Sequence, residues 1–369
     1  MKIKHLVILT SLLCSAQITA VSANDTSNLP AYGADLTQTS VSGLSSGAFM
    51  TSQIHVAYSN DFIGAGVIAG GPYYCSGSYS WQSHLQNAMT TCMSPLTASV
   101  APDGKKLFDK AETFAANGFI DDLNNLKDDK VYLFSGQNDK TVKTLVVDQT
   151  KVFYEAADIA GEQIFYNDTV NAGHAIITSD DDDVACSETH APYINDCDFI
   201  QSHNILKHIY GEDLRAPAET GKLSGQIIEF NQAEFIPPSG KHSSMSEKAY
   251  AYVPQSCETG ACRVHVAFHG CEQGANFQVK YNEKYGDQYY TTTGYNELAD
   301  TNNIIVLYPQ AEGSNVTPFN PKGCWDFWGY SSNDFYKKTA PQMVAVMGMV
   351  ERLGKQRQTV TAELTQAEK

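Results

Sequence analysis

Residues 41–50 read VSGLSSGAFM and contain the pentapeptide Gly43–Gly47, GLSSG. The preceding stretch, Leu36–Ser42, has the apolar, β-rich character of a strand, and Ala48–Tyr58 after it has a helical pattern. A serine in a sharp turn between a strand and a helix presents its hydroxyl at the end of a sheet, and the flanking glycines avoid Cβ clashes. The pattern in this setting predicts that Ser45 is a catalytic nucleophile. The alternative is an ordinary loop rich in serine and glycine.

A serine nucleophile needs a general base, and the base needs a carboxylate that orients it. The apolar run VYLFSG leads to Asp139, and the next strand-like run leads into a glycine-containing loop with His174. Ser…Asp…His is the chain order of an α/β-hydrolase. We therefore predict that His174 is the general base and that Asp139 orients it. Other histidines fall in helical stretches and are expected to be structural: His55, His203 and His208.

Apolar β-rich runs alternate with helical patterns along the chain, which favours a mostly parallel central sheet with helices on both faces. The predicted strands are Leu36–Ser42, Phe62–Ala69, Val131–Ser135, Gln163–Tyr166, Gln226–Phe230, Ala249–Val253, Val264–Phe268 and Ile304–Tyr308. The predicted helices include Ala48–Tyr58, Val142–Ala157 and Pro341–Leu353. The fold class expected from this alternation is α/β.

The position of the oxyanion loop predicts a rearranged chain order. An α/β-hydrolase usually supplies part of its oxyanion hole from a strand that precedes the nucleophile, but only a short segment precedes Ser45 here. The best candidate is VHVAFHGCEQG at 264–274, a buried strand followed by an HG-type loop with Cys271. Because this loop comes after the triad, we predict a circularly permuted α/β-hydrolase fold.

The N-terminus is typical of a secretory signal peptide. Lys2 and Lys4 supply the charged start, Leu6–Leu13 the apolar run, and residues 21–23 a small-residue cleavage site. The apolar run is too short to span a bilayer, so we expect no membrane anchor. We predict a signal peptide at 1–23, one catalytic domain at 24–353 and a polar tail at 354–369. The expected location is extracellular, with the periplasm as the alternative.

The chain has nine cysteines, of which Cys14 lies in the signal peptide. The even number that remains in an exported chain predicts four disulfides, which the sequence alone can connect in many ways. Local spacing favours Cys75–Cys92, Cys186–Cys197 and Cys257–Cys262, which leaves Cys271 with Cys324. A zinc site is the weaker alternative, because the sequence has no CxxC pair or HExxH motif. We expect no metal and no cofactor.

The chain is acidic, with 41 Asp and Glu against 25 Lys and Arg and a formal net charge of −16. Such a charge repels phosphate backbones, which argues against a nucleic-acid partner. We expect a monomer.

Several further motifs occur in order after GLSSG: SGQNDKTV, NAGH, CRVHVAFHGC, GYNELADTNNIIVLYPQ and NPKGCWDFWGY. Together they resemble extracellular poly(3-hydroxybutyrate) depolymerases of the circularly permuted, single-domain type, and the resemblance covers nearly all of residues 33–353. It implies a serine esterase with Ser45, Asp139 and His174 as its triad. It also implies that the backbone amides of Ser46 and Cys271 form the oxyanion hole.

The segment Cys324–Tyr330, CWDFWGY, is dense in aromatic residues, and we call it the aromatic segment. We expect Trp325, Trp328 and Tyr330 to line an apolar cleft for the substrate, and His269 to contact it as well. The alternative is that these side chains belong to the core.

The leading functional hypothesis is a secreted serine esterase that hydrolyses poly- or oligo(3-hydroxybutyrate) through an acyl-enzyme. A feruloyl or acetyl esterase acting on plant polysaccharide is the alternative within the enzymes, because related hydrolases share these motifs. A different class is a non-catalytic surface-binding protein that uses the aromatic segment. The intact Ser, Asp and His in order argue against that class.

Overall fold

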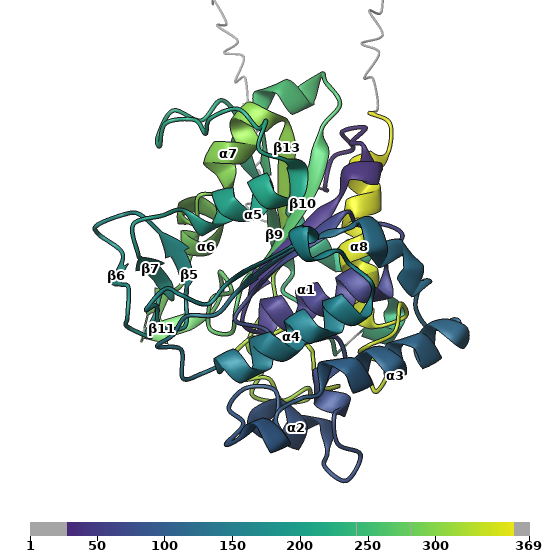
Figure 1. Ribbon diagram of the computed structural model, residues 1–369. Helices are drawn as coiled ribbons and strands as arrows, with labels where there is room; N and C mark the ends of the chain where they lie inside the picture. Colours follow the sequence, from purple (N-terminus) through teal and green to yellow (C-terminus); the bar gives the residue numbers. More distant parts are fainter. Residues whose placement is uncertain (1–27, 241, 281, 358–369) are drawn as a thin grey trace, which may run out of the picture.

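The computed structural model describes residues 28–240, 242–280 and 282–357. Its centre is an eight-stranded sheet with the strand order β4-β3-β2-β1-β10-β13-β9-β8 (Figure 1). The strands are β1 Ser40–Leu44, β2 Gly64–Ile68, β3 Lys130–Phe134, β4 Ile164–Asn167, β8 Gln226–Asn231, β9 Lys248–Val253, β10 Arg263–Phe268 and β13 Ile304–Tyr308. All neighbouring pairs from β4 to β13 are parallel, whereas β9 pairs antiparallel with both β13 and β8. Each of the eight predicted strands is a strand of this sheet.

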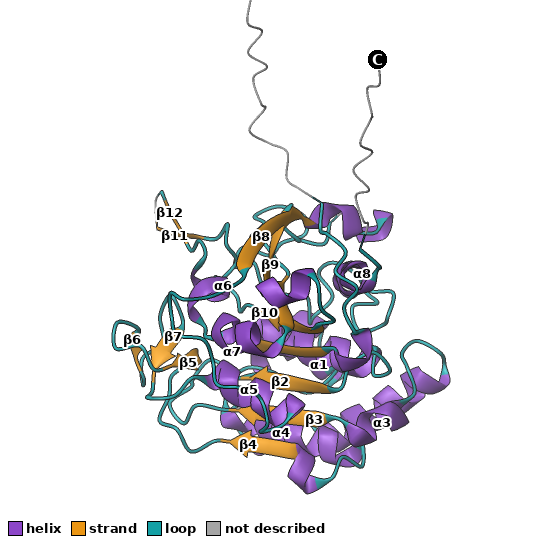
Figure 2. Ribbon diagram, turned by 90° about the horizontal axis from the view of Figure 1, so that it is seen from above, coloured by secondary structure: helices purple, strands orange, loops and turns teal. Residues whose placement is uncertain are grey.

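Helices cover both faces of the sheet (Figure 2). One face carries α1 Ser46–Ala57, α4 Thr144–Ala156 and α8 Pro341–Gly354, and α3 Gly104–Ala116 packs on α4. The other face carries α5 Gln201–Tyr210 and α7 Tyr295–Asn302, with α6 Gln288–Thr292 beside α7. The short helix α2, His84–Thr90, lies outside these layers. The predicted α/β layering with helices on both faces is therefore present.

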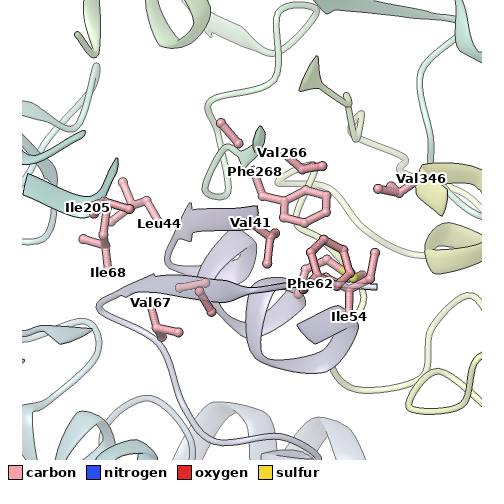
Figure 3. Packing of buried hydrophobic residues seen from close by; sticks show 14 of the residues in the cluster. Val41, Leu44, Ile54, Phe62, Val67, Ile68, Ile205, Val266, Phe268 and Val346 are labelled. Carbon is pink, nitrogen blue, oxygen red and sulfur yellow. The ribbon is translucent and has the colours of Figure 1, made fainter. Parts of the chain in front are cut away.

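The core includes the whole of β1, whose five residues are all buried. Val41 and Leu44 of β1 pack among Val67 and Ile68 of β2 and Phe268 of β10 (Figure 3). Strands covered on both faces bury side chains on both sides, which is why they read as nearly continuous apolar runs in the sequence. Burying each large apolar side chain contributes about 1.5–3 kcal/mol, so the centre of the sheet holds β1 firmly.

The sheet topology explains how the chain can begin at its nucleophile strand. β1 pairs with β2 on one side and with β10 on the other, and Gly43 lies opposite Phe268. The first half of the described chain builds the sheet outward through β2, β3 and β4, and the second half builds the other side. Parallel strands end at the same edge, so the loop after β10 lies beside the turn after β1, as the permuted order requires.

Two parts of the strand and helix assignment differ from the predictions. Leu36–Gln38 forms a 3-10 turn, because the Asp35 carboxylate caps the Thr37 N–H at 3.1 Å, and β1 begins only at Ser40. Short elements were not predicted, because a strand of two or three residues shows no periodicity. They are β5 Ile176–Thr178, β6 Val184–Ala185, β7 Ile194–Asp196, β11 Gln278–Lys280 and β12 Glu283–Lys284.

All four predicted disulfides are present, with Cα–Cα distances of 5.9 Å for Cys75–Cys92, 4.9 Å for Cys186–Cys197, 5.6 Å for Cys257–Cys262 and 4.2 Å for Cys271–Cys324. Across the described ranges, no helix combines the length and apolar character needed to cross a bilayer. The predicted signal peptide at 1–23 lies outside the described residues, as does most of the predicted tail at 354–369.

Candidate active site

The turn between β1 and α1 holds Ser45 in a strained conformation. Its φ is 58° and its ψ is −123°, a region that costs about 1–3 kcal/mol and is concentrated at functional sites. A methyl group on Gly43 would lie 2.5 Å from the Gly47 carbonyl oxygen, and one on Gly47 would lie 2.4 Å from the Phe268 carbonyl oxygen. Both glycines of the GLSSG motif are therefore required by close backbone approach, as the motif predicts.

Replacing Gly47 by alanine should destabilise the whole fold. The added methyl group would collide with rigid backbone at the end of β10, and overpacking of this kind costs about 1–3 kcal/mol. Gly161→Ala is the matched control, because a methyl group there meets nothing within 4 Å. Urea unfolding of both variants measures the difference, and an equal midpoint for the two would contradict the packing of this turn.

Asp139 follows β3 and is buried, with both carboxylate oxygens occupied. Its Oδ1 accepts hydrogen bonds from the backbone N–H groups of Thr141 at 2.8 Å and Val142 at 3.0 Å. Its Oδ2 lies 2.7 Å from Nδ1 of His174. With the backbone donors satisfied at Oδ1, Oδ2 is the acceptor for a proton on Nδ1, which leaves Nε2 of His174 able to accept a proton.

His174 lies on the loop after β4, and two other segments hold that loop. The His174 N–H donates to Thr189 Oγ1 at 2.9 Å, and the Gly173 N–H donates to the Cys186 carbonyl at 2.8 Å. A methyl group on Gly173 would lie 1.9 Å from the Glu188 carbonyl oxygen, so only glycine fits before the histidine. Cys186 is also pinned through its disulfide to Cys197. The NAGH motif therefore sits on a firmly held loop.

The carboxyl ends of β1, β3 and β4 lie along one edge of the parallel part of the sheet. Ser45 follows β1, and the Asp139–His174 pair follows β3 and β4. The three predicted triad residues thus come from one edge. The remaining histidines named above are engaged elsewhere: His55 with Asp129 and Tyr154, His203 with the Gly294 carbonyl and His208 with the Gln163 carbonyl.

The loop after β10 passes directly beside Ser45. A methyl group on Gly270 would lie 3.3 Å from the Ser45 Cβ. On the other side, the Trp325 N–H donates to Ser46 Oγ at 3.2 Å, and Cys271 is bonded to Cys324. Within the described part of the chain, the backbone N–H groups of Ser46 and Cys271 have no acceptor. Two free donors therefore lie in the backbone next to the Ser45 turn.

The aromatic segment departs from the sequence-based expectation at two residues. Trp325 has no exposed surface, and its ring packs against Phe268 and His269 at centroid distances of 4.8 and 5.5 Å. His269 is also fully buried. The expectation that these two contact the substrate is corrected, because both face the core beneath the loop.

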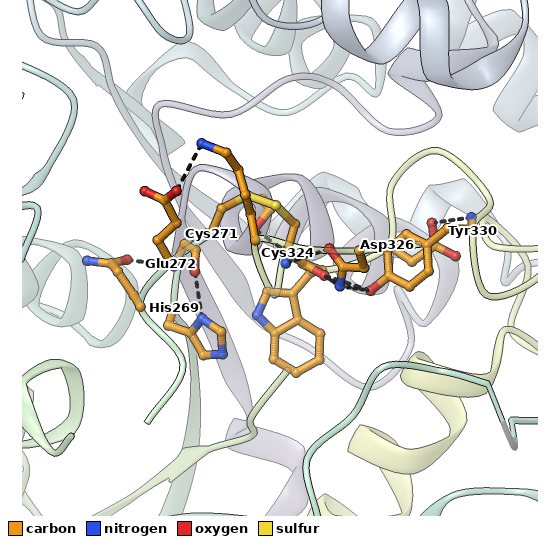
Figure 4. The surroundings of a disulfide bond; sticks show 12 residues. His269, Cys271, Glu272, Cys324, Asp326 and Tyr330 are labelled. Carbon is orange, nitrogen blue, oxygen red and sulfur yellow. Dashed lines mark hydrogen bonds and ion pairs between the residues drawn. A yellow bond between two sulfur atoms is a disulfide. The ribbon is translucent and has the colours of Figure 1, made fainter. Parts of the chain in front are cut away.

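The other two predicted aromatics keep some exposed surface. Trp328 is half-buried between Phe327 and Tyr330, each at a centroid distance of 4.9 Å. The Tyr330 hydroxyl donates to the Cys324 carbonyl at 2.6 Å, so it supports the segment from within (Figure 4).

Asp326 organises the aromatic segment, and sequence reasoning did not single it out. The side chain is buried, and its Oδ1 accepts hydrogen bonds from the backbone N–H groups of Trp328, Gly329 and Tyr330 at 3.2, 2.7 and 3.1 Å. Its Oδ2 accepts from the N–H and the hydroxyl of Ser331. Burial raises the pKa of this carboxyl, and the hydrogen bonds oppose that shift. The only sequence signal was an acid placed among aromatic residues.

Comparisons with known proteins place the chain among ester hydrolases of one kind. No protein-family model matches it. It is 43% identical over 333 residues to a poly(3-hydroxybutyrate) depolymerase from Delftia acidovorans, and the match covers 88% of this chain and 61% of that relative's length. It is 35% identical over 340 residues to a polyhydroxybutyrate depolymerase from Talaromyces funiculosus, covering 88% of this chain and 92% of the relative.

Two solved structures share the fold at 33% sequence identity, covering 89% of this chain and all of theirs. One is the PHB depolymerase from Penicillium funiculosum, with a TM-score of 0.77. The other is a variant of a PHB depolymerase complexed with an R3HB trimer, with a TM-score of 0.78. The predicted α/β-hydrolase fold is confirmed by these likenesses.

Proposed function

The chain belongs to the poly(3-hydroxybutyrate) depolymerase family, and from this premise we propose that it hydrolyses ester bonds of poly- or oligo(3-hydroxybutyrate) through a serine triad. The observation that carries the mechanism is the 2.7 Å contact between His174 Nδ1 and Asp139 Oδ2, at the sheet edge where Ser45 occupies its strained turn. The names of the relatives supply the substrate class.

In the first half of the reaction, Ser45 Oγ attacks the ester carbonyl while His174 Nε2 takes the hydroxyl proton. The carbonyl oxygen becomes an oxyanion, which the N–H groups of Ser46 and Cys271 stabilise. His174 then returns its proton to the leaving alkoxide, which departs as a hydroxyl-terminated fragment. The product left on the protein is an acyl ester of Ser45.

In the second half, water replaces the leaving alcohol. His174 removes a proton from the water as its oxygen attacks the acyl carbonyl, and the same two N–H groups hold the second oxyanion. When this intermediate collapses, the proton goes to Ser45 Oγ and the acid product leaves. Asp139 stabilises the protonated imidazole in both halves, because its carboxylate faces Nδ1.

Exposed apolar side chains around α2 support an apolar solid as substrate. Trp81, Leu85, Met89 and Leu96 are 75%, 53%, 57% and 88% exposed. The segment between β2 and α2 contacts the aromatic segment, because Ser76 Oγ donates a 2.6 Å hydrogen bond to the Phe327 carbonyl. Leu85 and Met89 are four residues apart on α2 and share a face of that helix. Neighbouring exposed apolar residues mark interaction surfaces, and a polyester surface fits their chemistry.

We also propose that the protein is exported. Four disulfides join all eight cysteines of the described residues, and disulfides persist in oxidising compartments outside the cytosol. The signal-like sequence at 1–23 agrees with this location. Mass determination of the N-terminus of protein recovered from culture medium and from periplasm tests both the cleavage and the compartment.

The proposed substrate is tested by incubating the purified chain with a poly(3-hydroxybutyrate) suspension and identifying soluble products by mass. We expect 3-hydroxybutyrate and its short oligomers. Feruloylated and acetylated polysaccharides are assayed in parallel. Release of ferulate or acetate without hydroxybutyrate products would overturn the proposed substrate in favour of the polysaccharide esterase.

Alanine at Trp328 should separate polymer hydrolysis from ester chemistry. Its half-buried ring leaves apolar surface on the aromatic segment, which the Cys271–Cys324 disulfide joins to the loop beside Ser45. A short soluble ester, in contrast, needs only the triad and the oxyanion donors. We expect hydrolysis of p-nitrophenyl butyrate to change by less than about 3-fold and hydrolysis of the polymer to fall about 10-fold.

Trp325→Ala is the matched control for Trp328→Ala. Because Trp325 is fully buried, its truncation should remove about 3–5 kcal/mol of stability and lower both activities together. Parallel losses on the two substrates in Trp328→Ala, with a melting temperature lowered as far as in Trp325→Ala, would assign Trp328 to the core.

A further inference from the structure

His269 directly follows β10 and is fully buried, and both of its ring nitrogens have hydrogen-bond partners. Nδ1 lies 2.7 Å from the Gly270 carbonyl oxygen, and Nε2 accepts the Ala311 N–H at 3.1 Å. A carbonyl can only accept and a backbone N–H can only donate. The ring is therefore neutral, with its single proton on Nδ1. Burial lowers the pKa of His269 to about 4, which agrees with a ring that stays neutral.

The carbonyl that His269 holds belongs to the same peptide unit as the Cys271 N–H. A trans peptide unit is planar, and its C=O and N–H point in opposite directions. A hydrogen bond that sets the direction of the Gly270 carbonyl therefore also sets the direction of the Cys271 N–H. Figure 4 shows the His269 ring next to the loop that carries Cys271, with this bond drawn as a dashed line.

We propose that His269 is a positioning residue that aims the Cys271 N–H at the oxyanion of the tetrahedral intermediate. This inference rests on the proposed function, because it assigns Cys271 an oxyanion. His269 itself touches no substrate. It acts through the peptide unit that follows it, which explains why a histidine stands at a position with no exposed surface.

Gln273 holds the preceding peptide unit, which joins His269 to Gly270. Its Oε1 accepts the Gly270 N–H at 2.7 Å, and its Nε2 donates to the Pro192 carbonyl at 2.9 Å. Pro192 lies three residues after Thr189, whose hydroxyl accepts the His174 N–H. The buried Gln273 side chain therefore joins the loop after β10 to the segment that holds the His174 loop. With the N–H and C=O of Gly270 both engaged, the Cys271 N–H is the donor left for a substrate.

Two substitutions of similar size separate the two bonds of His269. In His269→Asn, the amide nitrogen stands near the place of Nδ1 and can still donate to the Gly270 carbonyl, while the Ala311 N–H loses its acceptor. In His269→Gln, the longer side chain can offer Oε1 to the Ala311 N–H but has no donor at the place of Nδ1. The two variants therefore remove opposite halves of the contact.

We expect His269→Gln to lower kcat for p-nitrophenyl butyrate about 30- to 100-fold, with KM changed less than about 3-fold. Complete removal of one oxyanion donor lowers kcat about 10²- to 10³-fold, and a misdirected donor should cost somewhat less. His269→Asn should recover kcat to within about 5-fold of wild type. A trifluoromethyl ketone, which binds serine esterases as a tetrahedral oxyanion, should bind His269→Gln more weakly by the factor lost in kcat/KM. Melting temperatures are recorded for all variants.

Wild-type kcat in His269→Gln would overturn the inference. So would losses in both variants that follow the melting temperature while trifluoromethyl ketone binding stays unchanged, because a purely structural histidine gives that result. If His269→Gln does not fold, His269→Asn still tests the inference, because it keeps the donor toward the Gly270 carbonyl and should bind the ketone within about 5-fold of wild type. Ketone binding lost in His269→Asn at an unchanged melting temperature would then overturn the inference.

The assay uses a soluble ester, so it is independent of the polymer. If the wild-type chain hydrolyses p-nitrophenyl butyrate but releases nothing from poly(3-hydroxybutyrate), the proposed substrate is wrong. The His269 result would still stand in that case, because every hydrolysed ester forms the same oxyanion.

Discussion

Ser45→Ala should lose about 10⁶-fold in turnover on both p-nitrophenyl butyrate and poly(3-hydroxybutyrate), because loss of a triad nucleophile removes the covalent route altogether. Alanine differs from serine only by the hydroxyl, and the glycines that shape the turn remain in place. The melting temperature should therefore stay within a few degrees of wild type. Initial rates, measured with circular dichroism of the same samples, check the result.

Ser46→Ala is the control for the Ser45 variant. Its proposed contribution is a backbone N–H that alanine retains, although the Trp325 N–H loses its acceptor at Ser46 Oγ. We expect a loss of less than about 10-fold. A fluorophosphonate probe should add its mass to the peptide that contains Ser45. Labelling of another serine, or more than a few per cent of activity left in Ser45→Ala, would show that Ser45 is not the nucleophile.

The central sheet could be predicted because its strands obey a simple physical rule. A parallel strand covered on both faces must be apolar throughout, so runs such as Ile304–Tyr308 stand out in the sequence, and the observed β13 has those bounds. The permuted order followed from a different argument. A loop that supplies an oxyanion donor must lie beside the nucleophile, so the candidate loop at 269–271 indicated a chain order in which this loop follows the proposed triad. In the structure its strand, β10, pairs with β1.

The roles within the aromatic segment could not be predicted in the same way. Apolar rings are favoured both in cores and in apolar clefts, so composition does not separate Trp325, which is fully buried, from Trp328, which is half-buried. The contacts of Asp326 determine the path of the aromatic segment, because its carboxylate accepts hydrogen bonds from several backbone N–H groups that follow it. Those contacts depend on the path of the backbone, which no periodicity reveals.

His269 is a second residue whose role could not be predicted from the sequence. The sequence places a histidine beside the oxyanion loop, and a histidine near an active site suggests contact with substrate. The direction of its ring follows from tertiary contacts, because the acceptor at Gly270 and the donor at Ala311 come from loops after β10 and β13. Position along the chain was therefore predictable, whereas the partner of each nitrogen was not.

Asp139→Asn should lower kcat about 10⁴-fold while leaving the fold intact, and the reason lies in how the carboxylate is held. The backbone N–H groups of Thr141 and Val142 both donate to Oδ1. In the asparagine variant they still need an oxygen, so the amide turns its oxygen toward them and its nitrogen toward His174. That nitrogen is a donor, and Nδ1 must then act as acceptor. The imidazole proton moves to Nε2, where it blocks removal of the Ser45 proton.

The loss in Asp139→Asn should appear in kcat on the soluble ester, with a melting temperature close to wild type because the backbone contacts of the side chain are kept. Asp109→Asn is the matched control, since that carboxylate is exposed on α3 and pairs with Lys105, and its activity should be unchanged. Asp139→Ala lacks a donor toward Nδ1, so His174 can still adopt the productive tautomer. We therefore expect Asp139→Ala to retain at least as much activity as Asp139→Asn despite a lower stability. An asparagine variant with more than about a tenth of wild-type kcat would show that Asp139 does not set the tautomer of the base.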